Sequence, residues 1–306
     1  MNNLMLYAVS VLIWGSTWIA ITFQLGPVDT TASIAYRFAI AGAVILAWCT
    51  WRGTRFAFSL RDHVWIALLG LAFGLNYALV YFSEMHISSG LVAVASSSML
   101  FMNIGLARLF FGTRPTPEML AGAALGVVGI ALVFWPELEK FAASGSSPFI
   151  IGWPVLAAFG ASLANMVATR NGKAGLPVLP VNALWMLWTA VFMAGLTLVR
   201  GQSFGFAFTP GYIGSLLYLA VFGSVIAFGA YLTLLGRIGP GKASYVAILT
   251  PIIALVISTV FEGFTWHATT FAGIALSILG NVLIIRRKAP RLELPVAQPA
   301  CDKQAA

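Results

Sequence analysis

The chain has 306 residues, of which 60% are hydrophobic and only 8% are charged, and its mean hydropathy is +0.92. These values exclude an ordinary soluble domain, because such domains carry about a quarter charged residues. The formal net charge is +8, but the basic residues stand singly between apolar runs, unlike a nucleic-acid-binding surface. Cys49 and Cys301 form neither a disulfide framework nor a metal-ligand spacing. We therefore expect a protein in the lipid bilayer, with no nucleic-acid partner, metal or cofactor.

Ten apolar runs reach the length of about 20 residues that a bilayer crossing needs. They are 4–23, 32–51, 63–82, 88–110, 118–136, 151–169, 179–199, 211–234, 241–261 and 269–287. Turns rich in Gly and Pro separate them. No basic segment precedes the first run, so a membrane helix is favoured over a cleaved signal. The sequence therefore predicts an all-α integral membrane protein with ten transmembrane helices.

The basic residues of the connections lie almost entirely on one side when both chain ends are placed in the cytoplasm. Only Lys140 and Arg200 then fall on the outer side. Lys and Arg concentrate in cytoplasmic loops of membrane proteins. We therefore predict a multi-pass protein of the cell inner membrane with cytoplasmic N- and C-termini. Residues 289–306 combine prolines with scattered charges and are predicted to form a disordered cytoplasmic tail.

The stretch from Gly90 to Ile130 occurs twice in the chain. A shift of 151 positions matches, without a gap, Gly90 with Gly241, Phe110 with Phe261, Gly112 with Gly263, Gly122 with Gly273, Ala124 with Ala275, Leu125 with Leu276, Gly129 with Gly280 and Leu132 with Leu283. This predicts two five-helix repeats, residues 1–147 and 148–288. Because five is odd, the repeats have inverted topology, and a substrate site is expected near the midplane where they meet. The repeated small residues at helical spacing predict close helix packing.

Four short motifs stand out against the apolar background. They are Trp14-Gly15-Ser16-Thr17-Trp18, Tyr36-Arg37-Phe38, Thr250-Pro251 and Phe261-Glu262-Gly263. With the two repeats, they resemble the drug/metabolite transporter superfamily, EamA type, over about residues 4–288, and within it the YddG-type aromatic amino-acid exporters. The resemblance implies ten spans in two inverted repeats and transport of small metabolites. The first repeat departs from the family pattern, with Met99-Leu100 at the proline site and Phe111 where a glutamate is usual.

Deep polar residues are candidates for lining a substrate pathway. Lipid offers an amide no hydrogen-bond partner. Asn76, Asn103 and Asn165 are therefore expected to face either other helices or a wet cavity, and the sequence favours neither. Thr250-Pro251 lies at the centre of its run, and the proline frees a backbone carbonyl, as in broken helices that border transporter sites. The first repeat lacks this proline, and we expect Ser96-Ser97-Ser98 to loosen its helix instead.

Deep aromatic residues suit a cavity that stacks flat or apolar substrates. Trp14 and Trp18 are four residues apart and share a helix face, as do Trp185 and Trp188 at a spacing of three. For any single one, packing or lipid contact is at least as good an explanation. The predicted substrate-binding set is Trp14, Thr17, Trp18, Asn76, Tyr77, Ser97, Asn103, Asn165, Trp185, Tyr245, Thr250 and Pro251.

Ionisable groups are almost absent from the apolar runs, and Arg37 alone lies well inside one. It could anchor a substrate carboxylate, but a structural cation that caps carbonyls or reaches the outer interface is favoured. No Asp or Glu lies near a midplane, so facilitated efflux is simpler than proton coupling. Coupling through Glu84, Glu262, His86 or His267 is less favoured, and these four are expected to be solvated groups at the outer rim.

These observations predict a monomeric carrier that exports aromatic or apolar amino acids by alternating access. An efflux carrier of hydrophobic drugs or another metabolite is the alternative. An intramembrane enzyme would need clustered His, Asp or Glu at membrane depth, and duplication with deep amides argues against a scaffold without transport. Gly236–Lys242 fits a phosphate-binding loop up to its lysine, but Ala243 stands where a magnesium-binding hydroxyl is needed. Nucleotide binding is therefore not expected.

Overall fold

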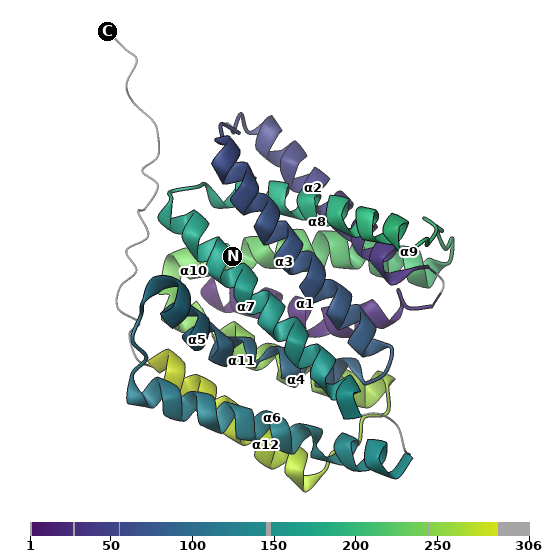
Figure 1. Ribbon diagram of the computed structural model, residues 1–306, viewed down its shortest axis with the longest axis vertical. Helices are drawn as coiled ribbons and strands as arrows, with labels where there is room; N and C mark the ends of the chain where they lie inside the picture. The colour runs from purple at the N-terminus through teal and green to yellow at the C-terminus, as the bar shows by residue number, and fades with distance from the viewer. Residues whose placement is uncertain (1, 27, 55, 145–147, 244, 287–306) are drawn as a thin grey trace.

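The computed structural model describes residues 2–26, 28–54, 56–144, 148–243 and 245–286. Every regular element in this part of the chain is helical, and the helices pack side by side in one bundle (Figure 1). They are α1 (Asn3–Thr22), α2 (Thr30–Trp51), α3 (Leu60–Glu84), α4 (Ser89–Ser96), α5 (Met99–Phe111), α6 (Pro117–Ser144), η1 (Pro148–Ile151), α7 (Gly152–Lys173), α8 (Val178–Val199), α9 (Pro210–Leu217), η2 (Tyr218–Ile226), α10 (Ala227–Ala243), α11 (Tyr245–Phe261) and α12 (Ala268–Arg286). The tail predicted to be disordered, 289–306, lies outside the described residues.

Each predicted apolar run overlaps a helix or a set of consecutive helices. Among the described residues, seven helical segments are long and apolar enough to cross a membrane, and Leu249–Phe261 and Ala268–Leu283 are shorter apolar segments. The all-α fold is therefore confirmed. The number of ten crossings stays a prediction.

Two of the predicted runs are interrupted helices. Run 88–110 forms α4 and α5 with a break at Ser97-Ser98, where three serines offer the backbone competing partners. Ser96 Oγ, for example, donates to the Val92 carbonyl at 2.9 Å. Run 211–234 forms α9, the π-helix η2 and α10. Such i→i+5 segments occur often at functional sites.

Local sequence signals explain where several helices begin and end. Asp29 caps α2 by accepting from the backbone N–H of Thr31 at 2.9 Å, and Ser59 and Asp62 form a capping box on α3. Gly112 and Gly263, which occupy equivalent positions in the two repeats, both have φ of +67° just after a helix. Glycine adopts this left-handed conformation without steric cost.

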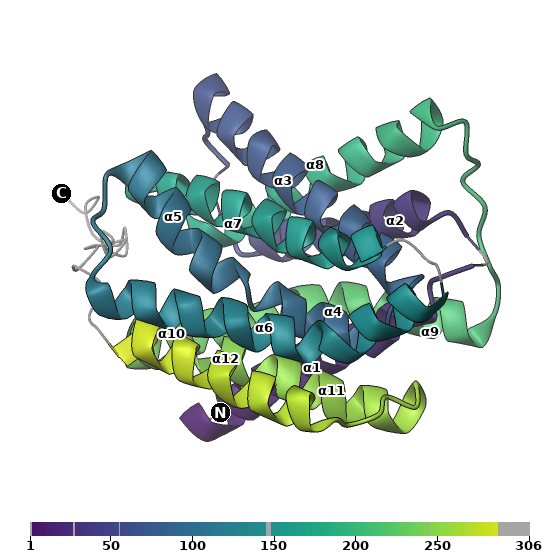
Figure 2. The same cartoon turned by 60° about the horizontal axis from the view of Figure 1, so that its bottom comes forward.

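Helices of the two halves pair across the bundle. The pairs α2 with α8, α3 with α7, α1 with α11 and α6 with α12 pack closely. Figures 1 and 2 both show α6 beside α12 along one edge of the bundle. Here a Cβ at Gly129 would come within 2.6 Å of the Gly273 carbonyl oxygen. The small residues of the repeats therefore allow close backbone approach, as the sequence predicted.

Candidate functional site

Arg37 occupies a buried position at the junction of the two halves. Its side chain is 3% exposed, and its guanidinium lies over the rings of Tyr77 and Phe38, with centroid distances of 4.7 and 5.3 Å. Nη2 faces the π-helix, where a Cβ added at Gly223 would lie 3.7 Å from it. Nε and Nη1 have no hydrogen-bond partner among the described residues. The favoured expectation of a capping or interface-reaching cation does not fit, because the side chain is buried and these two nitrogens bond no carbonyl.

The two rings that contact this guanidinium belong to a larger aromatic cluster. The Phe38 ring contacts the rings of Tyr77 and Trp185 at centroid distances of 4.9 and 5.6 Å, and Phe73 stacks on Trp185 at 4.5 Å. Trp185 Nε1 donates to Asn182 Oδ1 at 2.9 Å, which fixes the indole orientation. Tyr77 and Trp185, both in the predicted binding set, thus both contact Phe38, and Tyr77 also contacts the Arg37 guanidinium.

Glu84 lies at the end of α3 and is buried, with 7% exposure. Tyr77, Tyr81 and Glu84 follow the i, i+4, i+7 spacing of one helix face. Neither Glu84 oxygen, nor the Tyr81 hydroxyl, has a hydrogen-bond partner in the described part of the chain. The expectation of a solvated rim group is therefore wrong for Glu84.

Glu262 joins the end of α11 to the start of α4. Its Oε1 and Oε2 each accept from the Ser89 backbone N–H at 3.1 Å, and Oε2 accepts from Ser89 Oγ at 2.6 Å. A carboxylate at a helix N-terminus satisfies otherwise unpaired N–H groups and complements the helix dipole. Glu262 is thus a half-buried bonded group rather than a free rim group. His86 and His267 are exposed, as expected.

The Trp14 motif also contacts the π-helix. Trp14 Nε1 donates to the Gly223 carbonyl at 3.1 Å, and Ser16 Oγ lies 2.6 Å from the Tyr218 hydroxyl. Thr17 Cγ2 would be 2.9 Å from a Cβ at Gly223, so a larger residue there would have to displace the Thr17 methyl group. Trp14 and Thr17 therefore adjoin the Arg37 site through Gly223, whereas Trp18 packs into the main hydrophobic core.

The three deep amides contact other helices. Asn76 Nδ2 donates to the Ala157 carbonyl at 2.7 Å. Asn103 Oδ1 accepts from Ser162 Oγ at 2.6 Å, and Asn165 Nδ2 lies 3.3 Å from Met99 Sδ and 3.5 Å from Asn103 Oδ1. In this conformation the amides join α3 and α5 to α7, the first of the two open possibilities.

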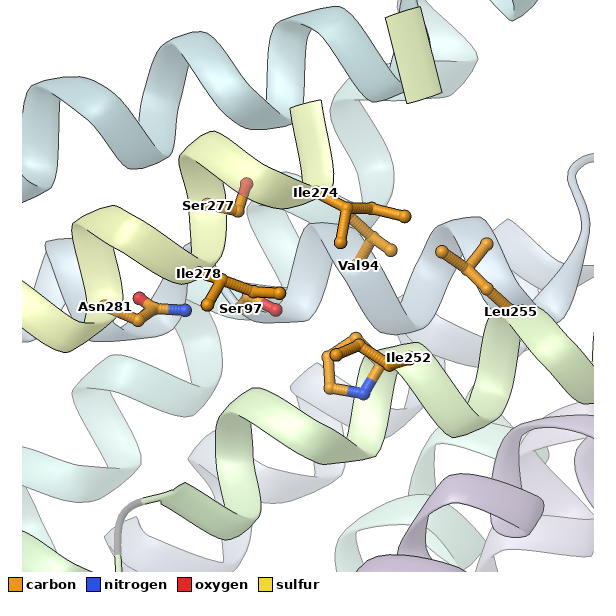
Figure 3. Close-up of a pocket in the computed structure, with 9 residues that line it drawn as sticks. Val94, Ser97, Ile252, Leu255, Ile274, Ser277, Ile278 and Asn281 are labelled. Atoms are coloured by element: carbon orange, nitrogen blue, oxygen red, sulfur yellow. The ribbon is translucent and has the colours of Figure 1, made fainter. Parts of the chain in front are cut away.

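Ser97 and Pro251 line a separate small cavity of about 20 Å³ between α4, α11 and α12. Figure 3 shows Ser97, Ser277 and Asn281 near Ile278, with Ile252 and Leu255 on the neighbouring helix α11. That volume holds about one water molecule, not an amino acid. Thr250 Oγ1 donates to the Val246 carbonyl of its own helix at 2.8 Å. The Tyr245 side chain lies outside the described residues.

Sequence reasoning left Arg37 out of the binding set and missed the positions of Glu84, Tyr81 and Gly223. The i, i+4, i+7 series on α3 was available as a signal for Glu84, since it continues the face of Tyr77. Nothing local marked Gly223, because its proximity to Thr17 and Arg37 is a contact between distant segments.

Comparison with known proteins identifies the family. The model of the EamA-like transporter family matches residues 2–135 and 148–286. The uncharacterized inner membrane transporter YedA of Escherichia coli K12 is 26% identical over 293 residues, covering 94% of this chain and 92% of its own. The probable terminal-alkyne amino-acid exporter of Streptantibioticus cattleyicolor is 27% identical over 288 residues, with 92% and 93% coverage.

A probable amino-acid metabolite efflux pump of Salmonella typhimurium is 23% identical over 292 residues, with coverage of 88% and 90%. One protein crystal structure has the same fold, with a TM-score of 0.64 and 17% identity over 92% of this chain and 96% of its own. The duplicated family match and the all-helical architecture agree. The chain belongs to the EamA-like transporter family and is a membrane transporter of small molecules.

Proposed function

We propose that this protein exports aromatic and other apolar amino acids across the cell inner membrane by alternating access. The observation that carries the proposal is the buried Arg37 guanidinium, with Nε and Nη1 unpaired among the described residues. Leaving charged donors unpaired away from water is costly. A planar guanidinium binds a carboxylate through two parallel hydrogen bonds, and every amino acid carries a carboxylate.

The aromatic cluster supports an apolar side chain on the substrate. The rings of Phe38 and Tyr77 adjoin the guanidinium. Trp185 packs on Phe38 and Phe73 packs on Trp185, so the cluster offers flat apolar surface for stacking. Two relatives are named as a probable terminal-alkyne amino-acid exporter and a probable amino-acid metabolite efflux pump. Both names agree with a substrate that has an amino-acid head group.

Alternating access follows from the proposed organisation as two inverted five-helix repeats, 1–147 and 148–288, in a monomer with both termini in the cytoplasm. Arg37 is held by the first repeat and faces Gly223 of the second. Relative motion of the repeats would therefore open the site first to one side of the membrane and then to the other.

Exchange of labelled phenylalanine in proteoliposomes tests this function. Wild-type protein should exchange phenylalanine, and unlabelled phenethylamine, which lacks the carboxylate, should not compete. Arg37→Gln should reduce exchange by about ten-fold or more, since a hydrogen bond to a charged group contributes about 1.5–3 kcal/mol. Arg37→Lys keeps the positive charge but cannot donate two parallel hydrogen bonds to a carboxylate, and it should retain part of the activity.

Failure to move phenylalanine, tryptophan or any other amino acid would end this proposal. Equal competition by phenethylamine, with full activity of Arg37→Gln, would instead favour the alternative of a carrier for hydrophobic drugs or metabolites that lack a carboxylate.

A further inference from the structure

A series of contacts connects Arg37, Glu84 and Glu262 where α2, α3 and the loop after α11 meet. The Arg37 guanidinium lies 4.7 Å from the centre of the Tyr77 ring, and Tyr77 shares a helix face with Glu84. Glu262 accepts hydrogen bonds from Ser89, five residues beyond Glu84, and the charges of Arg37 and Glu262 both act on the Glu84 carboxyl group. With both carboxylates ionised, the group carries a net charge of −1, and one bound proton makes it neutral. Like charges in a buried space disfavour full ionisation, so such a group tends to hold a proton.

The hydrogen bonds indicate which carboxylate takes that proton. Glu262 accepts three bonds from Ser89, which stabilise its ionised form. Glu84 is buried, and both of its oxygens lack a partner in the described part of the chain. An ionised oxygen without donors is costly in such a place. Glu84 is therefore the site for an exchangeable proton.

The remaining titratable groups on the helices packed against α3 do not compete. On α2, the Tyr36 hydroxyl donates to the Phe204 carbonyl at 3.0 Å, and Cys49 lies near the far end of the helix from Arg37. α4 and α8 carry none. Arg170 and Lys173 of α7 lie at its other end, where Arg170 pairs with Asp62 at 3.7 Å. Tyr7 lies near the start of α1. It is therefore far along the helix from Thr17, the residue of α1 that adjoins the Arg37 site. On α3 itself, Tyr77 and Tyr81 share the face of Glu84.

We propose that Glu84 couples transport to protons by binding either one proton or the ammonium group of the substrate. This inference rests on the proposed function, which places the substrate carboxylate on Arg37. A zwitterionic amino acid carries opposite charges that complement Arg37 and Glu84. Because proton and ammonium compete for one carboxylate, the carrier exchanges one outgoing amino acid for one incoming proton.

Each transport cycle exchanges one amino acid for one proton at Glu84. On the cytoplasmic side the substrate ammonium displaces the proton from Glu84, and the proton leaves to the cytoplasm. On the outer side the amino acid departs, and a proton from the outer solution binds the empty carboxylate. No covalent bond forms or breaks other than the O–H bond of Glu84, and one positive charge moves inward in each cycle.

Substrate-induced proton release tests this coupling directly. Phenylalanine added to purified protein in a weakly buffered solution containing a pH indicator should release up to one proton per wild-type molecule. Glu84→Gln should release none, whereas the matched control Glu139→Gln, at an exposed residue bonded to Trp135, should behave as wild type. In proteoliposomes, an acidic lumen should drive phenylalanine accumulation by wild type and Glu139→Gln but not by Glu84→Gln. Undiminished proton release or accumulation by Glu84→Gln would overturn the proposal.

An infrared pH titration separates failure of the coupling from failure of the proposed function, because it needs no substrate. Wild-type protein in lipid nanodiscs should show a protonated-carboxyl band that decreases with rising pH and is missing from Glu84→Gln. If phenylalanine is not transported but this band is present, the amino-acid assignment fails and the proton site stands. If phenylalanine is transported but no titrating band belongs to Glu84, the coupling is refuted. Should Glu84→Gln not fold, Glu84→Asp keeps the carboxyl and should shift the band rather than remove it.

Discussion

The carboxylate of Glu262 accepts three hydrogen bonds from Ser89, at distances of 2.6 to 3.1 Å. Ser89 belongs to the first family match and Glu262 to the second. These bonds therefore tie the two repeats together at the ends of α4 and α11. In the orientation predicted from the charge distribution, they lie on the outer side of the bundle, and we propose that they act as an outer closure.

Loss of this closure should shift the protein towards its outward-open form. Glu262→Gln or Ser89→Ala removes a charge-assisted contact that contributes about 1.5–3 kcal/mol, which corresponds to about ten-fold or more in the conformational equilibrium. Spin labels placed near the ends of α4 and α11 should report a larger population of long distances. Ser88→Ala is the matched control, since Ser88 Oγ has no partner among the described residues. A distance distribution that Glu262→Gln leaves unchanged would contradict the closure.

Tyr77 should select for aromatic substrates. Its ring lies 4.7 Å from the Arg37 guanidinium carbon, where it can contact both the cation and a substrate ring. Tyr77→Leu should raise KM for phenylalanine and tryptophan by about three- to ten-fold, in line with about 0.5–1.5 kcal/mol for an aromatic contact. Tyr77→Phe keeps the ring and should stay near wild type. Equal effects of both variants would assign the role to the hydroxyl instead.

Gly129 should be required for the pairing of α6 with α12. An added Cβ would meet the Gly273 carbonyl at 2.6 Å, and overpacking of this kind costs about 1–3 kcal/mol. Gly129→Ala should therefore lower the unfolding temperature in detergent. Gly105 lies in a helix with no neighbour within 4 Å of the added atom, and Gly105→Ala should keep or raise it. Similar unfolding temperatures for the two variants would show that the contact does not matter.

The two chain ends should lie on the same side of the membrane. Reporter tags that are active only in the cytoplasm, fused before Asn2 and after Ala306, should both be active in intact cells. This follows from ten crossings and from the basic inner loops. An active tag at one end only would mean an odd number of crossings and would remove the inverted repeat.

The repeat and its consequences could be predicted because they depend on local residue types. Gly122 and Gly273 mark close packing wherever their helices meet, and three consecutive serines mark a weak point in a helix. Arg37 and Glu84 could not be assigned in the same way. Glu84 stands at the end of an apolar run, where water is the default neighbour, yet it is 7% exposed. That burial, like the proximity of Arg37 to Gly223, depends on packing between segments that are far apart in the chain.

The deep amides illustrate the same limit. Chemistry requires a partner for Asn76, but whether that partner is a substrate, water or a helix depends on how α3 and α7 meet. The structure supplies the Ala157 carbonyl at 2.7 Å. Residue type thus predicts that a contact is needed, whereas the packing of helices determines which atom provides it.

The π-helix η2 places Gly223 beside Arg37, and Ser224 Oγ reaches the Leu219 carbonyl five residues earlier at 3.0 Å. A segment with i→i+5 pairing holds a surplus residue relative to an α-helix. Its return to i→i+4 pairing would turn α10 by about 100° relative to α9, the rotation of one residue step. Because α10 packs on α1, this rotation would bring different side chains of α10 into contact with Trp14, and neither helix would have to unfold.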